Sequence, residues 1–139
     1  MPGIEQTSSS SVDFANKGSN AKEGRRIFSK DGLRQIGAID IGTNSTHLLV
    51  ASIDPSLHSF SVEIAEKSTT RLGERDPVSG ELTDSAIERC LETLQRFKEL
   101  ALSYNVEQLV TAATSSVREA PNGGDFLGRI KEELDIDVD

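Results

Sequence analysis

Two apolar runs separated by four polar turn residues are the feature that most constrains how this chain can fold. The first run is Ile36–Ile41, which carries Asp40 near its end, and the second is Leu48–Ala51. The turn Gly42–Ser45 lies between them. Two β-type runs joined by a short polar turn predict a β-hairpin. Three donor-bearing side chains in the turn exceed what a hairpin needs, so the turn is also a candidate binding site.

The residue types of the turn allow two interpretations. Gly42 permits a positive φ and a close approach of another group to the backbone, and successive backbone N–H groups can form an anion-binding concavity. In that interpretation Thr43, Asn44 and Ser45 donate to phosphate oxygens and Asp40 holds a hydrated divalent cation. In the other, Gly42 and Asn44 serve only the backbone geometry of an ordinary hairpin. The local pattern alone does not separate the two.

The segment after the hairpin predicts a third strand and a long helix. Phe60, Val62 and Ile64 alternate with polar or small residues, which is typical of a half-exposed strand and completes an antiparallel meander. Thr83 is a good N-cap for a helix that runs to about Tyr104. The apolar face of this helix holds residues at helical spacing: Ile87, Cys90, Leu91, Leu94, Phe97 and Ala101. Cys90 on that face is interpreted as a structural cysteine.

The last third of the chain predicts a further strand and two helices. Gln108–Ala113 has the character of a short buried strand, parallel to the first strand through a right-handed crossover, and it leaves one edge of the sheet open. Thr114–Ala120 leads into a second helical region, which Pro121–Gly124 interrupts. Asp125 is a possible cap for a helix over Phe126–Leu134, and Ile136–Val138 begins another strand. The element order β-β-β-α-β-α-β predicts an α/β layer architecture.

Composition divides the chain into two parts. Residues 1–34 are rich in Ser, Gly, Asn and Lys without apolar periodicity, so we expect a disordered polar tail before a domain over 35–139. Of the formal net charge of −8, the tail carries +2 and the rest −10. The acidic body argues against nucleic-acid binding. Without a run of about 18 apolar residues or a secretory signal, and with one cysteine, we expect a cytoplasmic chain with no membrane contact.

Three segments together resemble a known family. They are Asp40–Ser45, Arg71–Glu74, and Ala113–Ala120 with the sequence ATSSVREA. In this order they are similar to the exopolyphosphatase and guanosine pentaphosphate phosphatase (Ppx/GppA) family, within the actin-like and sugar-kinase-like superfamily. The resemblance runs from about Gln35 to the end of the sequence. It implies a ribonuclease-H-like half-domain with a mixed sheet, truncated at the last strand.

The resemblance also implies a function and site residues. The substrate would be inorganic polyphosphate, or alternatively guanosine pentaphosphate, and the reaction a Mg²⁺-dependent hydrolysis of a terminal phosphoanhydride. Gly42, Thr43, Asn44, Ser45 and Arg118 would bind the substrate phosphates, and Asp40 would hold Mg²⁺. The family's general-base glutamate lies beyond Asp139. We therefore expect an N-terminal part of a homodimeric enzyme that is inactive alone.

Other interpretations stay open at this point. The chain could be a non-catalytic phosphate-binding module, or an actin-like or sugar-kinase-like ATPase. Arg118 could form a surface ion pair with Glu119 instead of binding phosphate. Arg71 could point to the site or form an ion pair with Glu66 or Glu74, and we slightly favour the ion pair. We expect His47 to be a strand histidine with its hydrogen bonds satisfied. If the first and fourth strands are parallel neighbours, their ends bring Asp40 and Arg118 to one edge, where ligands of α/β sheets bind.

Overall fold

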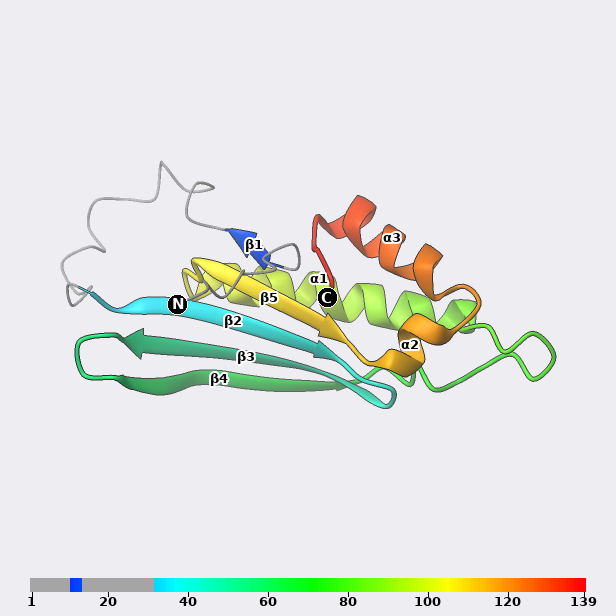
Figure 1. The fold of residues 1–139 in the computed structure, drawn as a ribbon, viewed down its shortest axis with the longest axis horizontal. Coiled ribbons are helices and arrows are strands. Elements are labelled where there is room, and N and C mark those ends of the chain that lie inside the picture. Colours follow the sequence, from blue (N-terminus) through cyan, green and yellow to red (C-terminus); the bar gives the residue numbers. More distant parts are fainter. Residues whose placement is uncertain (1–10, 14–31) are drawn as a thin grey trace, which may run out of the picture.

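The computed structural model describes residues 11–13 and 32–139, and for residues 11–13 only the backbone. These residues form five strands and three helices, and Figure 1 shows their arrangement. The strands are β1 (Ser11–Asp13), β2 (Arg34–Ile41), β3 (Ser45–Asp54), β4 (Ser59–Thr69) and β5 (Gln108–Ala113). The helices are α1 (Asp84–Ser103), α2 (Ser115–Glu119) and α3 (Gly123–Leu134). All strands form one sheet in the order β1-β5-β2-β3-β4.

The predicted meander is present. β2 pairs antiparallel with β3, so that Asp40 lies opposite His47, and β3 pairs antiparallel with β4. A register shift between Val50 and Ala51 leaves one residue of β4 without an opposite partner, which is a β-bulge. The hairpin that the sequence predicts around Gly42–Ser45 is therefore confirmed.

The predicted parallel pairing is also confirmed. β5 pairs parallel with β2, and the register sets Asp40 beside Ala112 and Ile41 beside Ala113. The chain reaches β5 through α1, which is the crossover that a parallel neighbour requires. The carboxyl ends of β2 and β5 thus lie side by side at one end of the sheet. The turn after β2 and the helix after β5 begin at this end (Figure 1).

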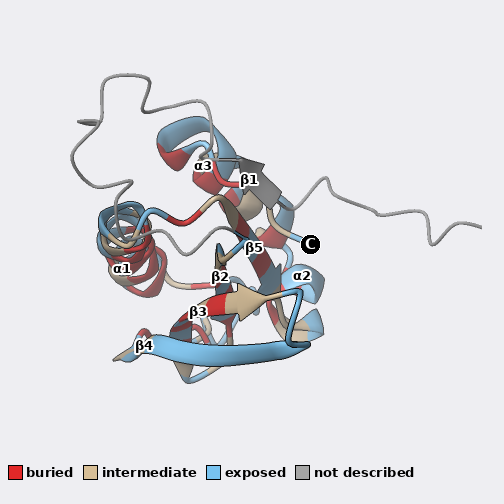
Figure 2. Ribbon diagram, turned by 90° about the vertical axis from the view of Figure 1, so that its left-hand side faces the viewer, coloured by how far each residue is buried: buried red, intermediate tan, exposed pale blue. Residues whose placement is uncertain are grey.

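The core lies between the sheet and α1 with α3. Thr83 caps α1 by accepting a hydrogen bond from the Ala86 N–H at 3.3 Å, as predicted. The six predicted apolar residues of α1 are all buried, and they meet strand residues such as Ile39, Ile41, Leu48 and Val50. In Figure 2 the buried residues face inward from α1, α3 and the strands, whereas β4 is exposed along most of its length. Helices therefore cover one face of the sheet.

The start of α3 differs from the prediction. The helix begins at Gly123, with Asn122 at the N-cap position, and not at Phe126 behind an Asp125 cap. A Cβ atom on Gly123 would lie 2.3 Å from the Val117 carbonyl oxygen, so the glycine is there for close packing under α2. Gly123 and Gly124 are therefore the first two residues of α3, although the sequence predicted that they interrupt the helical region.

The edges of the sheet also differ from the prediction. β5, which the sequence predicts to be an open edge strand, has backbone partners on its outer side in the described residues. β1 pairs with Gln108–Val110, and Asp139 pairs with the residues of β5 that follow. The Asp139 N–H donates to the Thr111 carbonyl at 2.9 Å, and the Ala113 N–H donates to the Asp139 carbonyl at 3.0 Å. This is the start of a parallel pairing, although the predicted strand over Ile136–Val138 is not formed. The edge strands of the described sheet are β1, which has three residues, and β4.

The predicted disordered tail falls mostly outside the described residues, since residues 1–10 and 14–31 are not among them. Two parts of that stretch are described as strand: β1, and the start of β2 at Arg34. β1 pairs with β5, and Arg34 pairs with Ile53 of β3, while the disordered tail stays a prediction for the rest of that stretch. None of the helices in the described residues has both the length and the apolar character needed to cross a bilayer.

Candidate functional site

The turn between β2 and β3 is tightly closed. The Gly42 N–H donates to the Ser45 carbonyl oxygen at 3.0 Å, and a Cβ atom on Gly42 would lie 2.7 Å from the same oxygen. Positive φ angles among the described glycines occur only at Gly32 and Gly80, so the positive φ allowed for Gly42 is not used. The close approach that the sequence suggested is real, but its partner is the turn's own carbonyl group. Any larger residue at position 42 must therefore open the turn.

The turn leaves several donors without partners. The N–H groups of Thr43 and Asn44 have no hydrogen-bond acceptor in the part of the chain that the structure describes. The side chains of Asn44 and Ser45 likewise make no hydrogen bond to a described residue. Two adjacent N–H groups in a turn form a concavity suited to an anion. These are the donors that the phosphate interpretation of the turn requires.

Helix α2 lies directly against this turn. The Thr43 and Ser116 hydroxyl oxygens are 2.9 Å apart, and the Ser116 and Thr114 hydroxyl oxygens are 3.2 Å apart. The Thr114 N–H donates to the Ile41 carbonyl at 3.1 Å, which joins the end of β5 to the end of β2. The turn and the Arg118 segment are thus at the same edge of the sheet, next to each other (Figure 1).

Arg118 is exposed on α2, two residues after Ser116. Its side chain forms no hydrogen bond or ion pair with any described residue, and Glu119 does not pair with it. The alternative of a surface ion pair is therefore not observed. The role of Arg118 in phosphate binding remains a prediction, as do those of Gly42, Thr43, Asn44 and Ser45.

The segment after β4 closes the other side of the turn. The Asn44 carbonyl accepts from the N–H groups of Thr70 and Arg71, both at 3.1 Å, and the Thr43 carbonyl accepts from the Gly73 N–H at 2.7 Å. A Cβ atom on Gly73 would lie 2.8 Å from the Thr43 methyl group, so glycine is needed for this contact. A hollow of about 520 Å³ forms between the two segments, lined by Thr43, Asn44, Thr69, Arg71, Gly73 and Glu74.

Arg71 does not form the ion pair assigned to it from the sequence. Glu74 pairs instead with Arg89 of α1 at 2.8 Å, and Arg89 also donates to the Thr70 carbonyl at 3.2 Å. The Arg71 side chain is exposed and makes no hydrogen bond or ion pair with a described residue. Its backbone is in the left-handed region, with φ of 54°. The structural interpretation of Arg71 is therefore wrong.

Three residues support this site although the sequence did not identify them individually: Arg75, Ser116 and Asn122. Arg75 donates to the Ser116 carbonyl at 2.6 Å and to the Gly80 carbonyl at 3.3 Å, so it connects the loop before α1 with α2. The Asn122 side chain exchanges two hydrogen bonds with the backbone of Leu82, at 2.8 and 3.0 Å. Ser116 lies in the ATSSVREA segment, where its motif position was a usable signal. Arg75 and Asn122 have no comparable signal, because Ser116 and Leu82, the residues that they connect to, are about 40 residues away in the sequence.

Asp40 lies on the open face of the sheet, beside Ala112 on one neighbouring strand and His47 on the other. The described residues contain no group of three or more His, Cys, Asp or Glu side chains that could hold a metal ion. Mg²⁺ commonly binds one or two carboxylates together with water and substrate phosphates. A single exposed carboxylate beside a phosphate turn fits that mode, and it does not fit a closed protein cage. His47 lies on β3 as expected, and its side chain is exposed and makes no hydrogen bond to a described residue.

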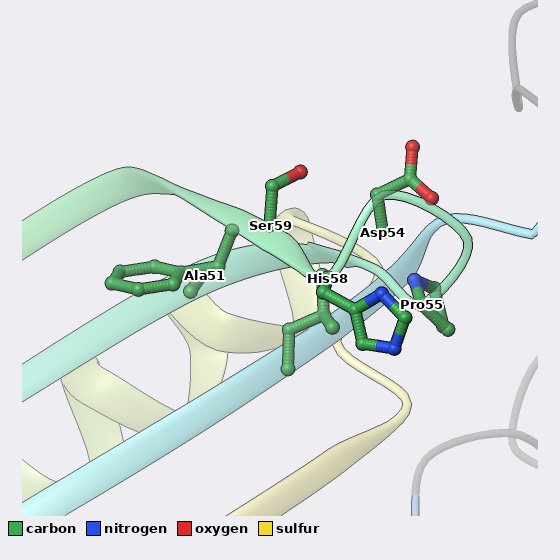
Figure 3. Close-up of a pocket in the computed structure, with 7 residues that line it drawn as sticks. Ala51, Asp54, Pro55, His58 and Ser59 are labelled. Carbon is green, nitrogen blue, oxygen red and sulfur yellow. The ribbon is translucent and has the colours of Figure 1, made fainter.

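A second hollow lies at the opposite end of the hairpin. It has about 510 Å³ and is lined by Ala51, Ile53, Asp54, Pro55, His58, Ser59 and Phe60 (Figure 3). The ten-residue strand β3 separates it from the turn at Gly42, which is a distance of about 30 Å. The Asp54 carboxylate accepts from the Ser56 and Leu57 N–H groups within its own turn. This hollow is thus a feature of the β3–β4 turn.

Cys90 is a buried thiol under the sheet. Burial raises the pKa of Cys90 to about 12, and a long contact of 4.0 Å with the Thr46 hydroxyl opposes this only weakly. The thiol is therefore protonated at neutral pH, and thiolate chemistry is excluded there. The structural interpretation of Cys90 is confirmed.

The sheet order, the crossover and the turn define a ribonuclease-H-like half-domain of the actin-like ATPase superfamily, as predicted. Residues 38–139 match the Ppx/GppA phosphatase family, and the chain belongs to this family. Exopolyphosphatase 1 of Mycobacterium tuberculosis is 32% identical over 104 residues, which cover 75% of this chain and 30% of that protein.

Solved structures agree with this assignment. The Aquifex aeolicus member of the Ppx/GppA family superposes with a TM-score of 0.72 at 30% identity, over 77% of this chain and 34% of that one. An exopolyphosphatase from Cytophaga hutchinsonii superposes with a TM-score of 0.69 at 35% identity, over 76% of this chain and 33% of that one. The chain thus spans about a third of the length of the relatives it matches.

Proposed function

We propose that this chain forms the phosphate-binding part of a phosphatase that hydrolyses terminal phosphoanhydrides of inorganic polyphosphate and releases orthophosphate. The observation that carries the proposal is the set of donors at one edge of the sheet. The Thr43 and Asn44 N–H groups have no described acceptor, and the unpaired Arg118 is two residues from Ser116, which contacts Thr43. Arginine suits this task because its planar guanidinium can bind phosphate through two hydrogen bonds.

Asp40 and Mg²⁺ belong to the same proposal. Mg²⁺ would neutralise charge on the phosphate oxygens, and Asp40 would hold the hydrated ion through its exposed carboxylate. Hydrolysis also needs a group that activates water. The family resemblance assigns that group to a glutamate which these 139 residues do not contain. We therefore propose that this chain alone binds phosphates and does not release orthophosphate from polyphosphate.

The further parts of the proposal rest on family membership. Guanosine pentaphosphate is the alternative substrate, and relatives named exopolyphosphatase favour polyphosphate. We also propose a cytoplasmic homodimer that binds no nucleic acid, in line with the acidic body. A phosphate-binding module without catalysis is the second candidate function, and the donors of the Gly42–Ser45 turn are equally consistent with it.

Binding of tripolyphosphate tests the proposal. Calorimetric titration of the 139-residue chain, with and without Mg²⁺, should show binding that Arg118→Ala weakens by about tenfold or more, since a hydrogen bond to a charged group contributes about 1.5–3 kcal/mol. Arg118→Lys should restore only part of the affinity. Gly42→Val should be worse than Arg118→Ala, because its side chain would meet the Ser45 carbonyl. Asp40→Asn should abolish the effect of Mg²⁺. Equal affinity of wild type, Arg118→Ala and Gly42→Val would contradict the proposal.

A further inference from the structure

Most cations of the described body already have an internal partner. Arg34, Arg89, Arg129 and Lys131 form ion pairs, Arg75 and Lys98 donate to carbonyl groups, and Arg96 lies 5.6 Å from the Phe97 ring centre. Three cations in residues 32–139 have no such contact with a described residue: Lys67, Arg71 and Arg118. All three lie toward the end of the sheet that carries the Gly42–Ser45 turn. Positive charge without an internal partner is thus concentrated at one place.

Arg71 has a fixed position in this group. It lines the hollow together with Thr43 and Asn44, and its N–H donates to the Asn44 carbonyl. The next residue, Leu72, is fully buried, and the Glu74 N–H donates back to the Arg71 carbonyl at 3.1 Å. A non-glycine residue in the left-handed region is strained and persists only where its surroundings dictate it. The contacts on both sides of Arg71 supply that constraint.

The surrounding acids do not neutralise Arg71. Glu74, the carboxylate in the same hollow, is bound to Arg89. Glu66 lies opposite Leu48 in the β3–β4 register, on the face that carries α1. Arg89 therefore has two effects. It pairs with the Glu74 carboxylate, which then forms no ion pair with Arg71, and it donates a hydrogen bond to the Thr70 carbonyl beside Arg71. Arg71 therefore lines the hollow without an acidic partner among the described residues, in a domain that is strongly acidic.

Thr43 lies between the two unpaired arginines. Its hydroxyl contacts Ser116 on the side of α2, which carries Arg118, and its carbonyl accepts from Gly73 on the side of Arg71. We infer that Arg71 binds a phosphate group of the substrate beyond the one held by the Gly42–Ser45 turn and Arg118. The ligand of the site is then a linear chain of phosphates and not a single orthophosphate. This inference rests on the proposed function and assigns Arg71 the second phosphate.

The test compares two phosphate ligands on matched variants of the chain. Arg71→Ala should weaken tripolyphosphate binding about tenfold or more, while orthophosphate binding changes less than about twofold. Arg118→Ala should weaken the binding of both ligands. Arg96→Ala is the matched control, because it removes the same charge from an exposed position on α1, and it should leave both affinities near wild type. Arg71→Lys should recover part of the tripolyphosphate affinity.

A glycine variant separates binding from folding. Arg71→Gly relieves the left-handed strain, so it should raise the thermal midpoint of unfolding while it weakens tripolyphosphate binding as much as Arg71→Ala. Equal tripolyphosphate affinity of Arg71→Ala and Arg96→Ala would overturn the inference and leave the proposed function standing. An equal loss for both ligands in Arg71→Ala would put Arg71 at the first phosphate and also overturn it. Absence of binding by the wild-type chain would remove the proposed function and this inference together.

Discussion

Replacing Gly123 by alanine tests whether close backbone packing holds α2 against the Gly42–Ser45 turn. A Cβ atom at this position would lie 2.3 Å from the Val117 carbonyl oxygen and 2.9 Å from the Arg118 carbonyl oxygen. Both atoms belong to the backbone of the α2 segment, so they cannot turn aside as a flexible side chain would. The substitution must therefore push α2 away from α3. Gly124, the next residue, has no atom within 4 Å of its Cβ position and is the matched control.

The expected magnitude follows from two opposing effects. Alanine is favoured over glycine in a helix by about 1 kcal/mol, and this gain applies to both positions. Overpacking costs about 1–3 kcal/mol, and it applies only at Gly123. We expect Gly124→Ala to raise the free energy of unfolding slightly, and Gly123→Ala to fall below it by about 1–3 kcal/mol. Urea denaturation of the two variants measures the difference.

The same pair of variants has a functional readout. Because α2 carries Ser116 and Arg118, its displacement in Gly123→Ala should also weaken tripolyphosphate binding, whereas Gly124→Ala should bind as the wild type does. Equal unfolding free energies for the two variants would refute the packing argument. Unequal stability with equal tripolyphosphate affinity would refute the connection between α2 and the turn.

Two further predictions concern the buried thiol and the loop before α1. Burial raises the Cys90 pKa to about 12 from its ordinary value of 9.0. The unfolded chain therefore loses this proton first as the pH rises, and the free energy of unfolding falls by about 1.4 kcal/mol per pH unit between these two values. Urea denaturation at pH 8 and pH 10 should show that extra loss in wild type relative to Cys90→Ala, and identical losses would contradict it. Asn122→Ala removes both hydrogen bonds to the Leu82 backbone, which should cost about 1–3 kcal/mol of unfolding free energy. Asn122→Asp keeps the acceptor for the Leu82 N–H but sets a carboxylate oxygen against the Leu82 carbonyl oxygen, so it should also be destabilising, and wild-type stability of both variants would count against the assignment.

The elements that the sequence predicts correctly are those with a local signal. The helix after Thr83 has a cap, an apolar face of regular spacing and no internal Gly or Pro, and it forms between Asp84 and Ser103. The hairpin follows from two β-type runs and a short turn, and its register is as expected from burial of Ile39 and Ile41. The parallel neighbour of β2 followed from the handedness rule for crossovers. In these cases the residues that decide the structure are close together in the chain.

The elements that the sequence does not predict depend on distant partners. Ser11–Asp13 has no β pattern of its own, and it becomes a strand because β5 offers unpaired backbone groups. The helix α3 begins at Gly123 because α2 requires a residue without a side chain there. The left-handed backbone of Arg71 has no signal in its residue type, since the hydrogen bonds to Asn44 impose it. Each of these depends on a contact that only the folded arrangement reveals.

The acidic composition illustrates the same difference for the functional site. A body with a net charge of −10 over residues 35–139 appears unsuited to a polyanionic ligand, because its average field repels phosphate. The contacts alter this expectation, since ion pairs occupy acids such as Glu74, Glu88 and Glu133 while Arg71 and Arg118 stay without described partners. Screening at physiological salt limits the reach of exposed charges to about 8 Å. A ligand at the turn therefore responds to the two arginines and the Thr43 and Asn44 N–H groups beside it more than to the distant acids. The proposed binding of phosphate should therefore depend on this local arrangement of charge and not on the net charge.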